Sequence, residues 1–265
     1  MIPKVIHYCW FGGNPLPKMA KKCIESWKLF FPDYEIIEWN ETNYDISKTP
    51  QYVQEAYELK KWAFVSDYAR LQIVYENGGI YFDTDVEVRK SFDFVLSHNA
   101  FFGFEVGKYI NTGLGFGAVK HLDVLKVMIN DYQDIHFRLE DGSLDQTSCP
   151  IRNTLALLRI GLNQNNSFQI LGNDIVILPT CFMCPVDFNT GDINITKDTI
   201  SIHWYSASWF YNNDKCKNRF VNRKKQIKRE KRKNNIDKIV HLPNRILKKV
   251  INDKMYNCIK NTLKR

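Results

Sequence analysis

The chain of 265 residues has no long apolar stretch. None of its windows reaches the roughly 18 consecutive apolar residues that a membrane-spanning helix requires. Its first residues also lack the basic region and apolar core of a secretory signal. We therefore expect a protein that is neither integral to a membrane nor exported, and that works in the cytoplasm.

Cysteine is sparse, scattered and odd in number, which argues against the disulfide framework of a small secreted domain. A reducing compartment fits the seven cysteines better. Cys181 and Cys184 form a single CxxC pair with no second pair or histidine pair nearby. We expect them to be core thiols rather than zinc ligands.

Acidic residues are rare at the carboxyl end of the chain. Residues 211–265 carry 19 Lys/Arg against 4 Asp/Glu, or +15, which leaves 18 against 25, or −7, for residues 1–210. A basic tail on a mildly acidic body predicts that the body does the chemistry and the tail meets an anionic partner. We place the boundary between a catalytic domain, 1–212, and a basic helical extension, 213–265.

The body has the pattern of an α/β fold. Apolar runs predict strands, and three- to four-residue apolar spacing predicts helices. The expected strands are 5–10, 34–39, 80–82, 100–104, 114–119, 175–178 and 199–204, and the expected helices are 17–31, 51–76, 122–137 and 151–161. Alternating strands and helices predict a large mixed sheet flanked by helices, with ligands beyond the carboxyl ends of the strands. Trp10 and Asp83 both fall at such ends.

Asp83 and Asp85 follow the strand expected at 80–82. Two carboxylates two residues apart can jointly offer oxygen ligands to a hard divalent cation. Such a cation stabilises the charge that appears on the diphosphate when a nucleotide sugar is cleaved. Alone, however, the pattern is also typical of a solvated turn.

Upstream, the helix around residues 62–75 is apolar on nearly every face, yet it carries Asp67 and Arg70 side by side at i and i+3. Buried charges are costly unless they are paired or used. Two interpretations stay open: an internal ion pair that holds the helix, or a pair that faces the sugar and diphosphate of a donor.

The segments Ser66-Asp-Tyr-Ala-Arg70 and Tyr75-Glu-Asn-Gly-Gly-Ile-Tyr-Phe-Asp-Thr-Asp85 resemble the DXD-containing family 32 glycosyltransferases. Those enzymes are similar in turn to the glucosylating domains of large clostridial toxins. The opening Ile2-Pro-Lys-Val-Ile-His-Tyr-Cys-Trp-Phe-Gly-Gly13 matches as well. The resemblance covers residues 1 to about 120, thins afterwards and returns near 203–209.

The resemblance implies a GT-A fold and a metal-dependent, retaining glycosyltransferase that uses Mn²⁺ or Mg²⁺. The donor would be a nucleotide sugar, with a UDP-sugar favoured, carrying a hexose or N-acetylhexosamine. The acceptor would be a glycan in surface or capsular polysaccharide synthesis. Retention can proceed by front-face attack or through a covalent enzyme nucleophile, for which Asp145 is a geometric candidate.

Site residues follow from the same resemblance. Trp10 would stack on the donor base, while Asp67 and Arg70 would hold the donor sugar and phosphate. Asp83 would contact ribose and sugar, and Asp85 would be the direct metal ligand.

The segment near 203–209 would complete this site. His203 would be a second metal ligand or a phosphate contact, and Ser208 and Trp209 would lie on the leaving group. Without the resemblance, His203 would be expected to be a core histidine.

Asn111 and the segment 145–147 are weaker candidates for the sugar and acceptor face. Where the family commonly has Thr-Gly-Pro, this chain has Thr147-Ser-Cys-Pro150, and that departure puts the acceptor side in doubt.

The tail from 242 to 264 predicts an amphipathic basic helix. Its apolar residues recur every three or four positions: Leu242, Ile246, Leu247, Val250, Ile251, Met255, Ile259 and Leu263. Such a helix binds anionic membranes, which would place the enzyme at the inner face of the membrane beside a lipid-linked acceptor. The alternative, an apolar stripe packed on the catalytic domain, is equally compatible with the pattern.

Two other functions remain as alternatives. A nucleic-acid-binding protein would explain the basic residues, but they are confined to the tail and the body carries no recognisable module, so we expect no nucleic acid partner. A metal-dependent sugar-nucleotide hydrolase or phosphodiesterase could use the same aspartates. Its two-metal site would need a denser set of ligands than six scattered histidines offer.

Overall fold

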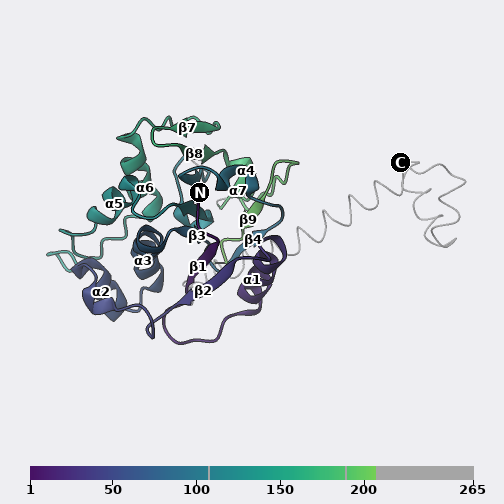
Figure 1. The fold of residues 1–265 in the computed structure, drawn as a ribbon. Helices are drawn as coiled ribbons and strands as arrows, with labels where there is room; N and C mark the ends of the chain where they lie inside the picture. Colours follow the sequence, from purple (N-terminus) through teal and green to yellow (C-terminus); the bar gives the residue numbers. More distant parts are fainter. Residues whose placement is uncertain (107, 189, 207–265) are drawn as a thin grey trace, which may run out of the picture. The chain divides into compact units, whose positions relative to one another are not determined.

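The computed structural model describes residues 1–206 except 107 and 189, and these belong to one compact unit, Met1–Trp209 (Figure 1). The boundary expected after residue 212 and the basic helix expected at 242–264 lie outside the described residues, and both stay predictions. Within the described residues, no helix is long and apolar enough to cross a bilayer.

The described chain alternates strands and helices. The strands are β1 (Val5–Cys9), β2 (Glu35–Trp39), β3 (Gly79–Tyr81), β4 (Val86–Val88), β5 (Ala100–Gly103), β6 (Phe116–Ala118), β7 (Gln169–Leu171), β8 (Ile175–Leu178) and β9 (Ser201–His203). The α-helices are α1 (Lys18–Phe30), α2 (Gln51–Glu58), α3 (Trp62–Asn77), α4 (Asp93–Leu96), α5 (Asp123–Asn130), α6 (Cys149–Leu158) and α7 (Thr180–Met183). Two 3₁₀ turns are η1 (Ile46–Lys48) and η2 (Thr112–Leu114).

Seven strands form one mixed sheet in the order β2-β1-β3-β6-β5-β8-β7. β1 is parallel to both β2 and β3, so the carboxyl ends of these three strands meet at one edge. β6 is antiparallel to β3 and β5, whereas β8 is parallel to β5. The predicted α/β class with a mixed sheet flanked by helices is confirmed.

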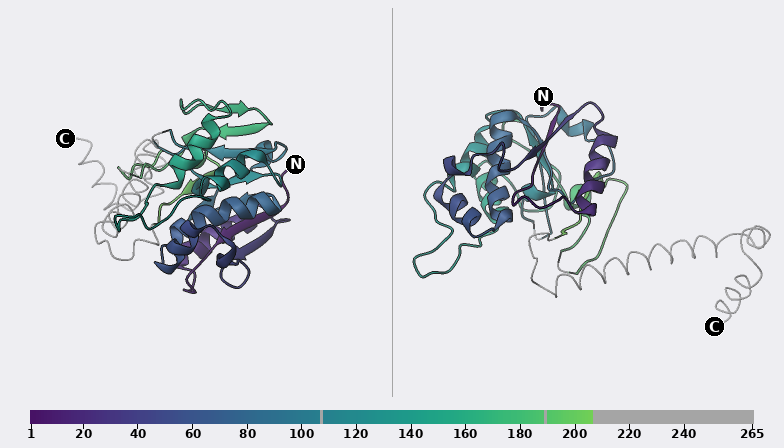
Figure 2. Two further views of the ribbon diagram at one scale, coloured as in Figure 1. Left: turned by 90° about the vertical axis from the view of Figure 1, so that its left-hand side faces the viewer. Right: turned by 90° about the horizontal axis from the view of Figure 1, so that it is seen from below.

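Each face of the sheet has its own apolar core. Helices α2, α3, α5 and α6 cover one face, and α1, α4 and α7 lie on the other (Figures 1 and 2). Successive residues of a strand point to opposite faces. Phe102 and Ile177 accordingly pack into the first core, while their neighbours Phe101 and Val176 pack into the second.

The last described residues belong to a second sheet, which consists of two strands, β4 and β9. β4 and β9 are antiparallel, with Val86 opposite His203. The Trp204 amide also donates to the Asp85 carbonyl at 3.0 Å. As a result, residues 203–206 lie directly against the segment that follows β3.

Two predicted elements need correction. The helix expected over 122–137 ends at Asn130, because Glu55 on α2 accepts the amides of Phe137 and Arg138 at 2.8 and 2.9 Å and holds them in a loop. The strand expected over 114–119 begins only at Phe116, since its first residue belongs to η2. Apolar spacing did not predict the short elements β4, β7, α4 and α7.

The turn into β3 is fixed by a buried histidine. The His7 imidazole donates from Nε2 to the Gly78 carbonyl at 2.9 Å and accepts the Trp39 indole N–H at Nδ1, 3.1 Å away. The next residue must be a glycine: its φ is +101°, and a Cβ on Gly79 would lie 2.6 Å from the Val5 carbonyl oxygen. His7 therefore ties β1, β2 and the start of β3 together.

His7 predicts a loss of stability in acid. Burial lowers the pKa of His7 from 6.5 to about 4, while the bond to Gly78 opposes that shift. Between these values the unfolded chain binds a proton that the folded protein does not, so the contribution of His7 to the unfolding free energy falls as pH drops.

We expect the stability difference between wild type and His7→Gln to be about 2 kcal/mol smaller at pH 5 than at pH 7.5. Urea unfolding at both pH values measures it. An unchanged difference would show that His7 does not stay neutral in the fold.

Candidate functional site

Three ligand-type side chains converge beyond the end of β3. Asp83, Asp85 and His203 each offer one atom, and these atoms lie within 4.8 Å of one another. His203 Nε2 is 3.1 Å from Asp85 Oδ1 and 3.9 Å from Asp83 Oδ2. The β4–β9 pairing produces this arrangement, since it sets residue 203 opposite residue 86.

The electrostatics of this group suit a cation. Burial alone would raise the pKa of Asp85, but His203 and the Ser206 amide, which donates to Oδ2 at 2.5 Å, lower it to about 2. Burial would likewise lower the pKa of His203, whereas the two aspartates raise it above 6.5. A divalent ion held by the same three side chains would supply the positive charge that these carboxylates favour.

The residues present fit a hard divalent ion. Two carboxylates and one imidazole are ligands that Mn²⁺ accepts readily and Mg²⁺ accepts through oxygen. His203 turns Nε2 toward both acids, while its buried Nδ1 has no hydrogen-bond partner among the described residues. An imidazole oriented in this way can ligate a metal through Nε2.

Arg70 joins this group to helix α3. The guanidinium is 3% exposed, and its Nη2 lies 2.9 Å from Asp67 Oδ1 and 3.2 Å from Asp83 Oδ1. Its Nε donates to the Ser66 carbonyl, and its Cζ lies 5.1 Å from the Tyr81 ring centroid. The structure therefore shows the Asp67–Arg70 pair that the sequence suggested and adds Asp83 as a second partner of Arg70.

Asp83 is oriented from two sides. Its Oδ1 accepts from Arg70 and from the Tyr81 hydroxyl, which is 3.0 Å away. Its Oδ2 faces η2, where a Cβ built on Gly113 would lie only 2.5 Å from that oxygen. Both constraints turn Oδ2 toward His203.

Asn111 fixes the η2 turn. Its Oδ1 accepts the Gly113 amide at 2.6 Å, and its Nδ2 donates to Glu105 Oε2 at 2.8 Å. The side chain is buried and stands beside the turn that contacts Asp83. Asn111, proposed from the sequence as a donor-side residue, is therefore brought to the site.

The remaining predicted residues are placed differently. Trp10 follows β1 at the same sheet edge, half-buried, with its indole N–H on the Asn14 carbonyl. Asp145 is engaged at both oxygens, by the Thr147 amide and by Arg152. Ser208 and Trp209 lie outside the described residues.

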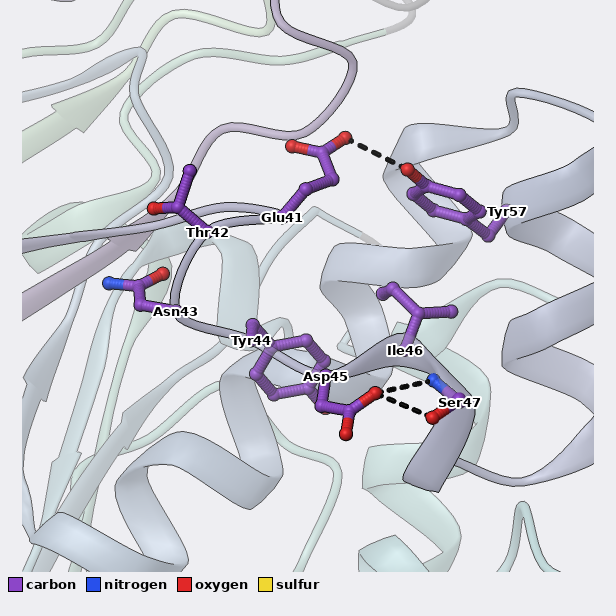
Figure 3. Close-up of a pocket in the computed structure, with 8 residues that line it drawn as sticks. All are labelled: Glu41, Thr42, Asn43, Tyr44, Asp45, Ile46, Ser47 and Tyr57. Carbon is purple, nitrogen blue, oxygen red and sulfur yellow. Dashed lines mark hydrogen bonds between the residues drawn. The ribbon is translucent and has the colours of Figure 1, made fainter.

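A pocket of about 500 Å³ opens at the carboxyl end of β2 (Figure 3). Its lining consists of residues 41–47 and Tyr57, and it includes the carboxylates of Glu41 and Asp45. Glu41 Oε1 accepts the Gly12 amide at 2.6 Å, and the Tyr57 hydroxyl lies 3.3 Å from the same oxygen. The pocket is thereby tied to the glycine turn after β1.

Several residues of the site carry no clear signal in the sequence. In the sequence, Tyr81 looks like any other strand residue. Its position two residues before Asp83 is the one signal that could have pointed to a role. Gly113 does not have a positive φ. A glycine is needed there because a Cβ would lie too close to Asp83 Oδ2. The thiol of Cys149 donates to Asp67, a contact between residues 82 positions apart that no local pattern predicts.

The CxxC pair is not part of this site. Cys184 is buried with its thiol 3.1 Å from the Tyr205 hydroxyl, and Cys181 is partly exposed. Among the described residues, Asp83, Asp85 and His203 form the one cluster with metal-ligand geometry, and it includes neither cysteine.

Residues 17–102 match the family described as glycosyltransferase sugar-binding region containing DXD motif. This span holds α1, β2, α2, α3, β3 and both aspartates of the motif. The sugar-binding DXD region predicted from the sequence is thus confirmed.

One curated relative is inositol phosphoceramide mannosyltransferase 3 of Schizosaccharomyces pombe (strain 972 / ATCC 24843). It is 32% identical over 111 residues, which cover 37% of this chain and 28% of that protein. The chain therefore spans less than a third of the length of this relative.

Solved structures of glycosyltransferases show a distant likeness. The PaToxG glycosyltransferase aligns with 17% identity and a TM-score of 0.43, over 60% of this chain and 68% of its own. The galactosyltransferase LgtC, in complex with donor and acceptor sugar analogs, aligns with 13% identity and a TM-score of 0.40, over 81% and 94% of the two chains. With identities and TM-scores this low, these structures carry no information about the functional site.

Gly113→Ala tests the close packing of η2 on Asp83. The new methyl group would overlap Oδ2 and turn the carboxylate away from His203. We expect Mn²⁺ to bind about tenfold more weakly and the unfolding free energy to fall by about 1–3 kcal/mol.

Isothermal titration with Mn²⁺ and urea unfolding measure the two effects. Gly172→Ala is the matched control, since a Cβ there meets nothing within 4 Å. Equal Mn²⁺ affinity in both variants would show that η2 does not orient Asp83.

Proposed function

We propose that this protein is a metal-dependent glycosyltransferase that moves a hexose or N-acetylhexosamine from a nucleotide sugar to a glycan acceptor. The observation that carries the proposal is the convergence of Asp83, Asp85 and His203, with Asp83 paired to the buried Arg70. The match of residues 17–102 to a sugar-binding DXD region supports it. Membership of glycosyltransferase family 32, a GT-A fold and kinship with the toxin domains belong to the same proposal.

Each side chain then has a role in the transfer. Asp85, Asp83 and His203 would hold Mn²⁺ or Mg²⁺, which supplies positive charge to the departing diphosphate. Arg70 stays charged, because Asp83 and Asp67 keep its pKa above its ordinary value despite burial. It orients Asp67 and Asp83 toward the hydroxyl groups of the donor sugar.

The nucleoside end of the donor would lie toward β1 and β2. Trp10 stands at the end of β1, and the pocket at the end of β2 offers the Glu41 carboxylate as an acceptor for a ribose hydroxyl. Carboxylates repel a diphosphate, so the phosphates would lie closer to Arg70. A UDP-sugar is the favoured donor, and transfer would retain the anomeric configuration.

Thermal unfolding with a panel of nucleotide sugars tests the proposal. A ligand that binds the native state raises the melting temperature by mass action. We expect one UDP-sugar to do so only with Mn²⁺ or Mg²⁺. GDP-mannose is included because one relative is named a mannosyltransferase. No shift with any nucleotide sugar would overturn the proposal, and donor consumption without an acceptor glycan would favour a hydrolase.

Asp85→Asn is expected to reduce turnover at least a thousandfold while the protein stays folded, because the site loses a charged ligand at the point where the diphosphate departs. Turnover of the donor found above and circular dichroism measure this. Asp174→Asn is the control, since that carboxylate is half exposed and pairs with His98. Undiminished turnover in Asp85→Asn would contradict the assigned metal role.

We also propose that residues 242–264 hold the protein at the cytoplasmic face of a membrane, where a lipid-linked glycan of surface polysaccharide synthesis would be the acceptor. The sequence places six lysines and arginines beside the apolar positions: Arg245, Lys248, Lys249, Lys254, Lys260 and Lys264. Each contributes on the order of 1 kcal/mol at an anionic surface.

Sedimentation with vesicles containing phosphatidylserine tests this role of the tail. We expect the full chain to bind and a chain ending at residue 212 to stay in solution, with the difference shrinking at high salt. Equal binding of both chains to the vesicles would contradict the membrane proposal without affecting the transferase proposal.

A further inference from the structure

The segment from Asp145 to Cys149 is held by an ion pair. Arg152 Nη2 lies 2.5 Å from Asp145 Oδ2, and the two side chains are 13% and 17% exposed. Asp145 Oδ1 accepts the Thr147 amide at 2.9 Å. The Thr147 bonds and Arg152 outweigh burial and lower the pKa of Asp145. Both oxygens of this carboxylate therefore have donors within the protein.

Arg152 is itself held in place. Its guanidinium lies 5.5 Å from the Tyr52 ring centroid and 5.2 Å from that of Tyr132. The Tyr52 hydroxyl also donates to the Asp145 carbonyl at 3.3 Å. Cation–π contacts with two rings restrict the rotamers of Arg152, so its guanidinium points in one direction.

The segment leads directly to the donor-sugar residues. Cys149 ends it as a buried residue. Burial raises the pKa of Asp67, which pairs with Arg70, and the Cys149 thiol helps to lower it. Residues 146–148 between the two anchors are exposed. A continuous set of contacts therefore runs from Arg152 through the segment to the carboxylate that faces Arg70.

We propose that Arg152 is a positioning residue that holds residues 145–149 as one wall of the sugar site beside Asp67, with Asp145 serving as its anchor rather than as a nucleophile. The inference rests on the proposed function for its effect on donor binding. The anchoring itself is a property of the fold and has its own test.

Hydrogen exchange measures the anchoring. In Arg152→Gln the Thr147 amide should lose its fixed acceptor, and peptides covering 139–150 should exchange at least tenfold faster than in wild type. Arg138→Gln is the matched control, because Arg138 lies in the same loop and pairs with exposed Glu58 at 3.0 Å. Unchanged exchange in Arg152→Gln would overturn the proposal.

Kinetics with the donor identified above separate positioning from catalysis. Asp145→Asn, Arg152→Gln and the double variant should each raise the donor KM about tenfold with kcat changed less than threefold, and the double variant should be no worse than either single one. The double variant removes both charges together, so that neither is left unpaired, and circular dichroism of each variant checks that it is folded. Arg152→Lys should recover part of the affinity.

Other outcomes contradict the proposal. A kcat lowered by several orders of magnitude in Asp145→Asn but not in Arg152→Gln would make Asp145 the nucleophile. Faster exchange with an unchanged donor KM would reduce the pair to a structural contact. If wild type bound no nucleotide sugar while Arg152→Gln still loosened the segment, the proposed function would fall and the anchoring by Arg152 would stand.

Discussion

The site depends on one buried cation. Arg70 is almost fully enclosed, and such a charge is tolerated only with partners of opposite sign and donors that are all used. Its partners, Asp67 and Asp83, come from α3 and from the segment after β3. The guanidinium thereby joins a helix to the sheet edge and orients one oxygen of Asp83, which leaves the other for the cluster with His203. Removing this charge would leave two acids without compensation.

The sequence was most informative where contacts are local. The i, i+3 spacing of Asp67 and Arg70 and the alternation in Asp83-Thr-Asp85 each act within one turn or one strand, so local pattern predicted them. Strand existence was predicted well for the same reason. The helix expected over 122–137 is shorter than predicted, and at its far end Glu55, distant in the chain, accepts the amides of Phe137 and Arg138.

Residues brought together over long sequence separations could not be predicted from pattern alone. His203 reaches Asp85 through the β4–β9 pairing, more than a hundred residues apart, and only the resemblance indicated it. Arg152 and Tyr52 meet around Asp145 without any periodic signal. Gly113 is required by the approach of a carboxylate oxygen, which is a property of tertiary packing. These long-range contacts determine how the side chains of the site are oriented, and local sequence patterns do not predict that orientation.

The charges of the side chains around His203 explain why this site suits a divalent cation. With the His203 imidazole neutral, the acidic side chains around it, those of Asp83, Asp85 and Glu105, outnumber the positive charge of Arg70 in a buried space. Protonation of His203 offsets one of them, and this accounts for its raised pKa. A dication would supply two positive charges to the same three ligand atoms, and a diphosphate bound beside it would add negative charge that such an ion and Arg70 could offset. In the proposed function, donor binding and metal binding would therefore be coupled through electrostatics.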